Sequence, residues 1–171
     1  MTRADFVIRE EQPGDAAALA RLSARAFGPG RFARTAYRVR EAAGMRGSTG
    51  KLDLCAWRGE RLVGSIRFSE IAIGGASGAL LLGPLAIDPD HVGRGCGRGL
   101  IEEGLGRAQA AGYALVVLVG DLTYYRKFGF DLCPAGRMEL PGPVDPVRIL
   151  VKELRPGALD GFHGAVRALP S

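Results

Sequence analysis

The stretch HVGRGCGRGL, residues 91–100, has a glycine at every second position from 93 to 99 and arginines at 94 and 98. Such a run is typical either of a flexible linker or of a backbone loop that holds phosphate oxygens. An almost wholly apolar run, 78–87, precedes it, and a helical pattern, 98–111, follows it. The glycines therefore join two core elements, and this position favours a structural or ligand-binding loop over a linker.

The segments on both sides of this loop predict a βαβ unit. The apolar run 78–87 is a strand, and 98–111 is a helix that ends at Gly112. ALVVLVG, residues 114–120, has the composition of a buried parallel strand, so the unit is a right-handed crossover. Pro84 inside the first strand would break its ladder and predicts a bulge or an edge. The apolar stripe of the helix is Leu100, Ile101, Leu105 and Ala108.

The remaining pattern completes an α/β (α+β mixed-sheet) fold with a mainly antiparallel sheet. Residues 52–87 predict an antiparallel meander with turns at 59–60 and 74–78. We expect a loop at 44–51 and an irregular tail at 155–166. Outside the βαβ unit, the predicted elements are strand 6–10, helix 12–27 capped by Asp15, helix 32–43, strands 52–59 and 61–73, a short helix, turn and strand at 121–132, and strand 147–154.

Length and composition predict one soluble domain over residues 1–171. Hydrophobic residues make up 47% of the chain and charged residues 24%, the balance of a globular protein. No apolar run is long enough to span a bilayer, so we expect no membrane partner. The amino terminus carries charges where a signal peptide has an apolar core, and we expect a cytoplasmic protein.

The cysteines and histidines give little support to metal or nucleophilic chemistry. Cys55, Cys96 and Cys133 are odd in number and form no CxxC pair, and neither His91 nor His163 completes a metal-ligand spacing. No GxSxG motif is present. We therefore expect no metal cofactor and no structural disulfide.

The net charge of +5 comes with a cluster of arginines early in the chain. This cluster predicts either an anion-attracting surface or a solvated helix face. We favour the solvated face and expect no nucleic-acid partner, because no recognition module accompanies the charge. The cluster consists of Arg21, Arg25, Arg31, Arg34, Arg38, Arg40 and Arg46.

Two common phosphate-binding motifs do not fit the glycine loop. A Walker loop needs GxxxxGK[ST], and the stretch has no Gly-Lys pair. The dinucleotide motif GxGxxG fails as well, because its last position falls on Arg98 or Leu100. What remains is GxGxG entering a helix, whose amides and dipole suit a pyrophosphate.

At these residues the chain resembles the GNAT family of acyl-CoA-dependent acetyltransferases, whose signature is [Q/R]xxGx[G/A] at the start of a helix. Here the signature falls on Val92-Gly93-Arg94-Gly95-Cys96-Gly97. A tyrosine five residues before the phenylalanine of a Gly-Phe pair is also typical, as in Tyr125 and Phe130. VLVGDLTYYRKFGF (117–130) with ELRPGAL (153–159) is similar to the YhbS-type branch of the family.

The resemblance implies that acetyl-CoA is the acyl donor. It also implies that two neighbouring strands splay apart after a bulge, so that the pantetheine arm of acetyl-CoA enters between the strands. It assigns the arm to the strand backbone and the pyrophosphate to the glycine loop. Val92 departs from the family's Gln or Arg, and this removes one side-chain contact to the ligand. The implied acetyl-CoA contacts are Leu85, Ala86, Ile87, Val92, Gly93, Arg94, Gly95, Cys96, Gly97, Arg98, Tyr124 and Lys127.

Two catalytic residues follow from the same resemblance. Tyr125 has the position of the acid that protonates the departing sulfur. Glu70 is the only acid within strand 61–73 and falls on the side of Ile66 and Phe68 by alternation. It is either an inward-facing base with a raised pKa or a surface charge on the strand, and both readings stay open. Cys96, near a helix amino terminus, is a packed residue rather than a nucleophile.

We therefore predict an N-acetyltransferase that transfers an acetyl group to a primary amine by direct attack in a ternary complex. The amine belongs to a small molecule or a protein, and the enzyme is a monomer or homodimer. Two alternatives remain: a non-catalytic acyl-CoA-binding sensor, which Val92 permits, and a nucleic-acid-associated protein that uses the arginines of 21–46.

Overall fold

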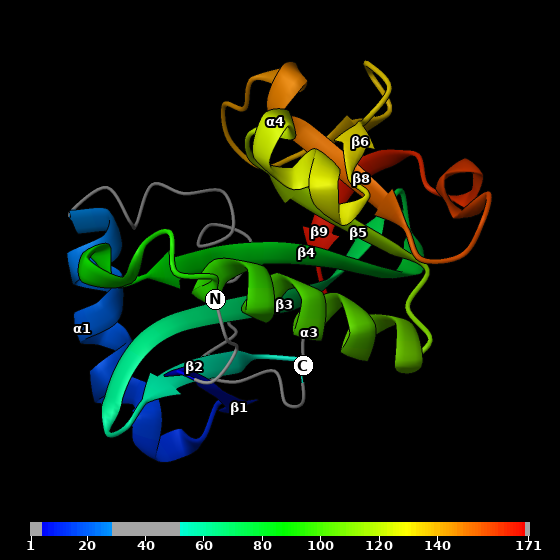
Figure 1. The fold of residues 1–171 in the computed structure, drawn as a ribbon. Coiled ribbons are helices and arrows are strands. Elements are labelled where there is room, and N and C mark those ends of the chain that lie inside the picture. Colours follow the sequence, from blue (N-terminus) through cyan, green and yellow to red (C-terminus); the bar gives the residue numbers. More distant parts are fainter. Residues whose placement is uncertain (1–4, 29–51, 170–171) are drawn as a thin grey trace.

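The computed structural model describes residues 5–28 and 52–169, and its backbone is drawn in Figure 1. Its strands form one mixed sheet in the order β1-β2-β3-β4-β5-β8-β6, with β9 beside β3 and β7 beside β9. The predicted helix 32–43, the loop 44–51 and most of the arginine cluster lie outside the described residues. The strands are β1 (Val7–Glu10), β2 (Leu54–Arg58), β3 (Arg61–Ile73), β4 (Ala76–Ile87), β5 (Leu115–Val119), β6 (Asp131–Leu132), β7 (Met138–Glu139), β8 (Ile149–Glu153) and β9 (Gly164–Ala168).

Three α-helices are described together with short 3-10 turns. The α-helices are α1 (Ala16–Phe27), α3 (Cys96–Ala110) and α4 (Leu122–Tyr125). The 3-10 turns are η2 (Pro13–Asp15), η4 (Pro89–His91), η5 (Arg126–Phe128), η6 (Pro146–Arg148) and η7 (Ala158–Gly161). No helix among the described residues is long and apolar enough to cross a membrane.

The predicted βαβ unit is confirmed. β4 and β5 pair in parallel, from Ala79 with Leu115 to Leu81 with Val117, and α3 connects them. The meander β2-β3-β4 is antiparallel, as is the pairing of β5 with β8. The mainly antiparallel sheet with a central parallel pair is therefore the observed architecture.

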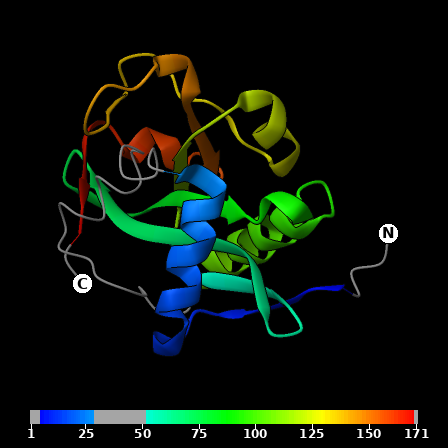
Figure 2. The same ribbon diagram turned by 90° about the vertical axis from the view of Figure 1, so that its left-hand side faces the viewer.

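The two faces of the sheet are covered by different helices (Figures 1 and 2). Leu100 and Ile101 of α3 pack in one buried cluster with β3 residues such as Phe68. Leu19 and Leu22 of α1 pack in another, with Ala86 of β4 among its members. The hydrophobic effect holds each helix through its apolar stripe, so β4 lies between α1 and α3.

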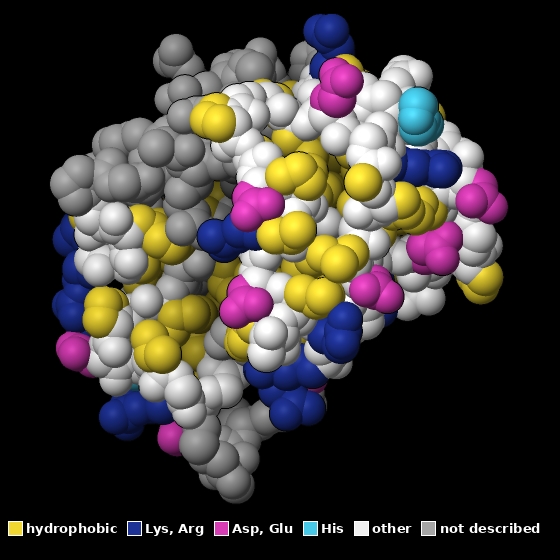
Figure 3. All heavy atoms as spheres, turned by 90° about the horizontal axis from the view of Figure 1, so that it is seen from above, with side chains coloured by type: hydrophobic (Ala, Val, Ile, Leu, Met, Phe, Trp, Pro, Cys, Tyr) yellow, Lys and Arg dark blue, Asp and Glu magenta, His cyan; other side chains and the backbone are white. Residues whose placement is uncertain are grey.

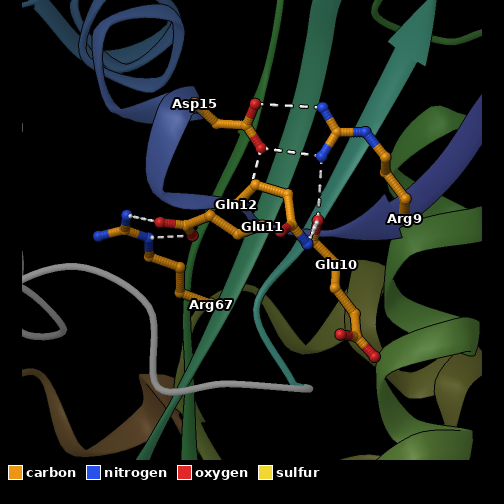
Figure 4. A network of polar contacts seen from close by, with 6 residues as sticks. All are labelled: Arg9, Glu10, Glu11, Gln12, Asp15 and Arg67. Carbon is orange, nitrogen blue, oxygen red and sulfur yellow. Dashed lines mark hydrogen bonds and ion pairs between the residues drawn. The ribbon is translucent and has the colours of Figure 1, made fainter.

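Asp15 departs from the predicted role of a side-chain cap on α1, since no capping hydrogen bond from it to the helix is present. Its carboxylate instead accepts two hydrogen bonds from Arg9, at 2.9 and 3.1 Å, and one from the Gln12 amide. The hydrogen bond from Arg9 is the main cause that lowers the Asp15 pKa. Figure 4 shows this network beside the bidentate pair of Arg67 with Glu11, and together they join β1 and β3 to the start of α1.

The prediction of an irregular tail at 155–166 is wrong. Residues 158–161 form η7, and β9 follows and pairs with both β3 and β7. β3 is long enough to extend past its partner β2, and its Ile71–Ile73 end pairs with Val166–Ala168 of β9. A five-residue strand that begins with glycine carries a weak sequence signal, and its pairing depends on an edge that is distant in the sequence.

Candidate functional site

β4 contains the bulge that Pro84 predicted. Phe68 of β3 faces Leu82, whereas Ile66, two residues away, faces Leu85. Two residues of β4 therefore stand where β3 has one, and they are Gly83 and Pro84, which a cis peptide bond joins.

β4 and β5 part directly after their third residue pair. Beyond Leu81 and Val117 the two strands make no ladder contact, although β4 continues to Ile87 and remains paired with β3. Alternate backbone groups of residues 82–87 therefore point away from β3 toward the space between the strands. We call this side of residues 82–87 the open edge.

The amino terminus of α3 lies at the same end of the βαβ unit. The first hydrogen bond of the helix runs from the Gly99 amide to the Gly95 carbonyl, at 3.0 Å. The amides of Cys96, Gly97 and Arg98 therefore have no acceptor inside the helix, and in the described part of the chain no side chain caps the helix at Gly95. These amides and the positive end of the helix dipole suit an anion.

The glycines of the loop have two different tasks. Gly93 and Gly95 have φ of +80° and +85°, a region that other residues rarely adopt. Gly97 has no such φ, but a Cβ at this position would lie 3.2 Å from the Tyr124 hydroxyl. The first two glycines therefore shape the loop, and the third leaves room beside it.

Cys96 is a packing residue, as expected. Its side chain is buried in the cluster between α3 and the sheet, and a Cβ at Gly64 of β3 would lie only 2.6 Å from its Sγ. Burial raises the pKa of the Cys96 thiol to about 11, so the reactive thiolate is scarce at neutral pH. Only its backbone amide is available to a ligand.

The two tyrosines of α4 point in different directions. The Tyr124 hydroxyl lies beside Gly97, and the Lys127 ammonium stands 4.2 Å from the Tyr124 ring centre. Burial raises the pKa of Tyr124. The Tyr125 ring instead packs against Gly120, directly after β5, and edge-on against Phe130 at 5.8 Å. Tyr124 therefore faces the glycine loop, and Tyr125 lies at the end of β5.

A cavity of about 670 Å³ borders the glycine loop on the side of β1. Arg94 and Arg98 line it, and Arg98 also pairs with Glu102 at 2.9 Å. Phe6 and Ile8 form its apolar wall. The sequence motif does not extend to these two residues, because only the pairing of β1 with β2 brings them beside α3.

The alternative in which Glu70 faces inward as a buried base is wrong. Its side chain is exposed and accepts a hydrogen bond from the Tyr113 hydroxyl. Glu70 pairs with Leu80, which lies five residues, or roughly 16 Å, from Leu85. Alternation does place Glu70 on the α3 side, but α3 ends at Ala110 and does not cover it.

A second, apolar cavity of about 290 Å³ is lined by the chain from 133 to 149, where Ile149 of β8 pairs with Val119 of β5. Figure 3 shows hydrophobic side chains gathered on this upper face of the molecule. The residues that line the cavity include Cys133, Pro134, Met138, Leu140, Val144 and Ile149.

Within residues 5–28 and 52–169, no group of three His, Cys, Asp or Glu side chains is arranged to hold a metal ion.

Comparison with known proteins agrees with this geometry. Residues 53–132 match the family described as the acetyltransferase (GNAT) domain. The chain is 32% identical over 163 residues to the uncharacterized N-acetyltransferase YhbS of Escherichia coli K12, covering 94% of this chain and 95% of YhbS. The chain therefore belongs to the GNAT family of acyl-CoA-dependent N-acetyltransferases.

Two solved structures make the relation more specific. YhbS from Escherichia coli, crystallised in complex with CoA, matches with a TM-score of 0.82 at 29% identity, covering 98% of this chain and 92% of that one. A GNAT acetyltransferase from Brucella melitensis, in complex with acetyl-CoA, matches with a TM-score of 0.65 at 32% identity, over 91% and 98%. The resemblance to the YhbS branch is thus confirmed.

Proposed function

We propose that this protein transfers the acetyl group of acetyl-CoA to a primary amine by direct attack in a ternary complex. The observation that carries the proposal is the position of two backbone sites at one end of the βαβ unit. The open edge of β4 and the amides of Cys96, Gly97 and Arg98 are separated by only the turn from 88 to 95. The CoA and acetyl-CoA bound to the two structural relatives support this assignment.

The diphosphate of acetyl-CoA binds at the glycine loop in this proposal. The three amides of α3 donate to its oxygens, while Arg94 and Arg98, both exposed, add positive charge. Tyr124 and Lys127 border the ligand on the side of α4. Gly97 has no side chain of its own, so the oxygens approach its backbone closely.

The pantetheine arm lies along the open edge. Its amides bond to the backbone of Leu85, Ala86 and Ile87, which has lost its β5 partner. The half-buried side chains of Leu85 and Ile87, packed against the α3 cluster, give the arm an apolar wall. The thioester carbonyl then lies near the bulge at Gly83-Pro84.

The chemistry needs a nucleophile, an oxyanion site and an acid. The neutral amine nitrogen attacks the thioester carbon, and the carbonyl oxygen becomes an oxyanion held by backbone amides near the bulge. Collapse breaks the carbon–sulfur bond, and Tyr125, at the end of β5, protonates the departing sulfur. The proton that the attacking nitrogen loses passes through water and restores the tyrosine hydroxyl. Because Glu70 is exposed and distant, we do not propose it as the base.

A thiol-release assay tests the transfer. With acetyl-CoA and a panel of primary amines, DTNB should detect CoA release that depends on the amine, above the rate without amine. The described cysteines, Cys55, Cys96 and Cys133, are buried and add little background. Calorimetric binding of acetyl-CoA with no amine-dependent release for any amine would instead support the sensor that does not catalyse transfer. Absence of binding would remove the site.

The departure at Val92 gives a further prediction. The side chain is 67% exposed, so a glutamine has room to reach the ligand. Val92→Gln should tighten acetyl-CoA binding about fivefold, which corresponds to one hydrogen bond of about 1 kcal/mol. The control is Val147→Gln, at a valine that is 63% exposed and remote in sequence from the loop. Unchanged or weaker binding in Val92→Gln alone would mean that Arg94 already makes this contact or that the motif register is wrong.

A further inference from the structure

The turn between β4 and the glycine loop contains a buried carboxylate with an unusual number of partners. Asp88 is 2% exposed. It accepts hydrogen bonds from Arg61 at 3.0 Å, from Arg25 at 3.2 Å and from the Asp90 amide at 2.9 Å. Despite burial, which alone raises its pKa, the bonds from the Asp90 amide and Arg61 hold the Asp88 pKa below its usual value. The carboxylate therefore stays charged at neutral pH.

Each partner of Asp88 comes from a different element. Arg25 is in the last turn of α1, Arg61 begins β3, and the Asp90 amide belongs to η4. The Asp88 amide also donates to the Val63 carbonyl at 2.8 Å. One side chain thus ties the end of β4 to the helix on one face and to the neighbouring strand.

His91 continues this anchor toward the loop. Its side chain is 6% exposed, and its amide donates to the Asp88 carbonyl at 2.8 Å. Its Nδ1 lies 3.6 Å from Asp88 Oδ1 and has no hydrogen-bond partner among residues 5–28 and 52–169. Directly after it, the four residues Val92 to Gly95 are all exposed. The burial of His91 therefore marks where the fixed turn ends and the loop begins.

The loop has a second buried anchor at its other end. Cys96 packs against Gly64, which follows Val63 in β3. Both ends of the exposed loop are therefore mounted on the first residues of β3: Arg61 and Val63 hold one end, and Gly64 receives the other. The loop itself, with two glycines of positive φ, has no buried side chain of its own to fix it.

A cap for η4 does not by itself need two arginines. The chain repeats the local motif at Asp145-Pro146, where the Asp145 side chain accepts from the Val147 amide at 3.1 Å and caps η6. In the described part of the chain no arginine pairs with Asp145, and its side chain is exposed. Arg25 and Arg61 thus add something at Asp88 that capping alone does not require.

We propose that Asp88 is a positioning residue for acyl-CoA binding, which it favours by holding the glycine loop in its binding conformation through Arg25, Arg61 and His91. The inference rests on the function proposed above. Asp88 does not touch the ligand, since it is buried and its charge would repel a diphosphate. A loop that samples other conformations binds more weakly in proportion to the fraction that is competent, and Asp88 keeps that fraction high.

The discriminating variant is Asp88→Asn, studied in the full chain. Asparagine keeps the volume and the oxygen that caps η4. It removes the buried one of the two carboxylate charges, Asp88 and Asp90, with which both arginines pair. The dissociation constant for acetyl-CoA, measured by calorimetry on folded protein, should rise about tenfold. Asp145→Asn, the matched cap, should change it less than twofold. Arg61→Gln should give an intermediate rise, because one of the two arginines remains.

Melting temperature separates positioning from mere stability. If Asp88 only stabilises the fold, Asp88→Asn lowers the melting temperature while the folded fraction binds acetyl-CoA with unchanged affinity, and the inference is wrong. An equal loss of affinity in Asp145→Asn would also overturn it, since capping would then suffice. If the unaltered protein does not bind acetyl-CoA, the proposed function fails first. Binding by that protein with equal affinity in Asp88→Asn overturns this inference alone.

Discussion

Gly97→Val should bind acetyl-CoA about 100-fold more weakly or lose binding altogether, while the fold survives. The valine branches would fill the space between α3 and the Tyr124 hydroxyl, which a Cβ already approaches to 3.2 Å. Phosphate oxygens would then be kept from the amides of Gly97 and Arg98. The loss of one or two hydrogen bonds to a charged group, at about 1.5–3 kcal/mol each, accounts for this magnitude.

Calorimetry with acetyl-CoA measures the effect, and Gly106→Val is its control. Gly106 lies on the exposed side of the same helix, and a Cβ there would meet nothing within 4 Å. Gly97 is also a cleaner test than Gly95, whose φ of +85° would strain any other residue. Undiminished affinity in Gly97→Val would remove the glycine loop from the proposed site.

Tyr125→Phe should lower kcat by about 100-fold or more, with the affinity for acetyl-CoA and the melting temperature nearly unchanged. The substitution keeps the ring, and with it the packing against Gly120, Phe128 and Phe130. Only the hydroxyl that would protonate the sulfur is lost. Steady-state kinetics at saturating acetyl-CoA, with the best amine from the panel, measure the change.

The neighbouring tyrosine is the natural comparison. Because the Tyr124 hydroxyl lies beside Gly97, Tyr124→Phe should raise the KM for acetyl-CoA more than it lowers kcat. A large loss of kcat in Tyr124→Phe with full activity in Tyr125→Phe would transfer the acid to Tyr124. Full activity in both variants would leave the reaction without a tyrosine acid.

The centre of the fold was predictable because its signals are local. The helix predicted at 98–111 is observed at Cys96–Ala110, and the strand predicted at 114–120 is β5. Apolar periodicity and glycine position suffice for such elements. The bulge was predictable from Pro84, because a residue without an amide hydrogen cannot continue the hydrogen-bond ladder of a central strand.

The features that could not be predicted from the sequence depend on which distant parts of the chain pack against a residue. Alternation assigned Glu70 to the correct face, but its exposure follows from the length of α3. In the cluster around Asp88, the pairing of β3 with β4 brings Arg61 to Asp88, but only the packing of α1 on the sheet brings Arg25 there. Phe6 and Ile8 were not expected beside the glycine loop, because it is the pairing of β1 with β2 that brings them there.

The open edge is a stretch of unpaired strand backbone in the middle of a sheet, whereas other proteins have unpaired strand backbone at the rim. An unpaired strand at the rim is a template for aggregation, because any extended chain can add to it. Here the edge lies between β4 and β5, whose last ladder pair is Leu81 with Val117, so it is inside the sheet and not at its rim. In the function proposed above, the ligand at this edge is a pantetheine arm, whose two amide groups can bond to the strand as a peptide does. We expect the molecule to gain the affinity of β-augmentation without the risk of polymerising.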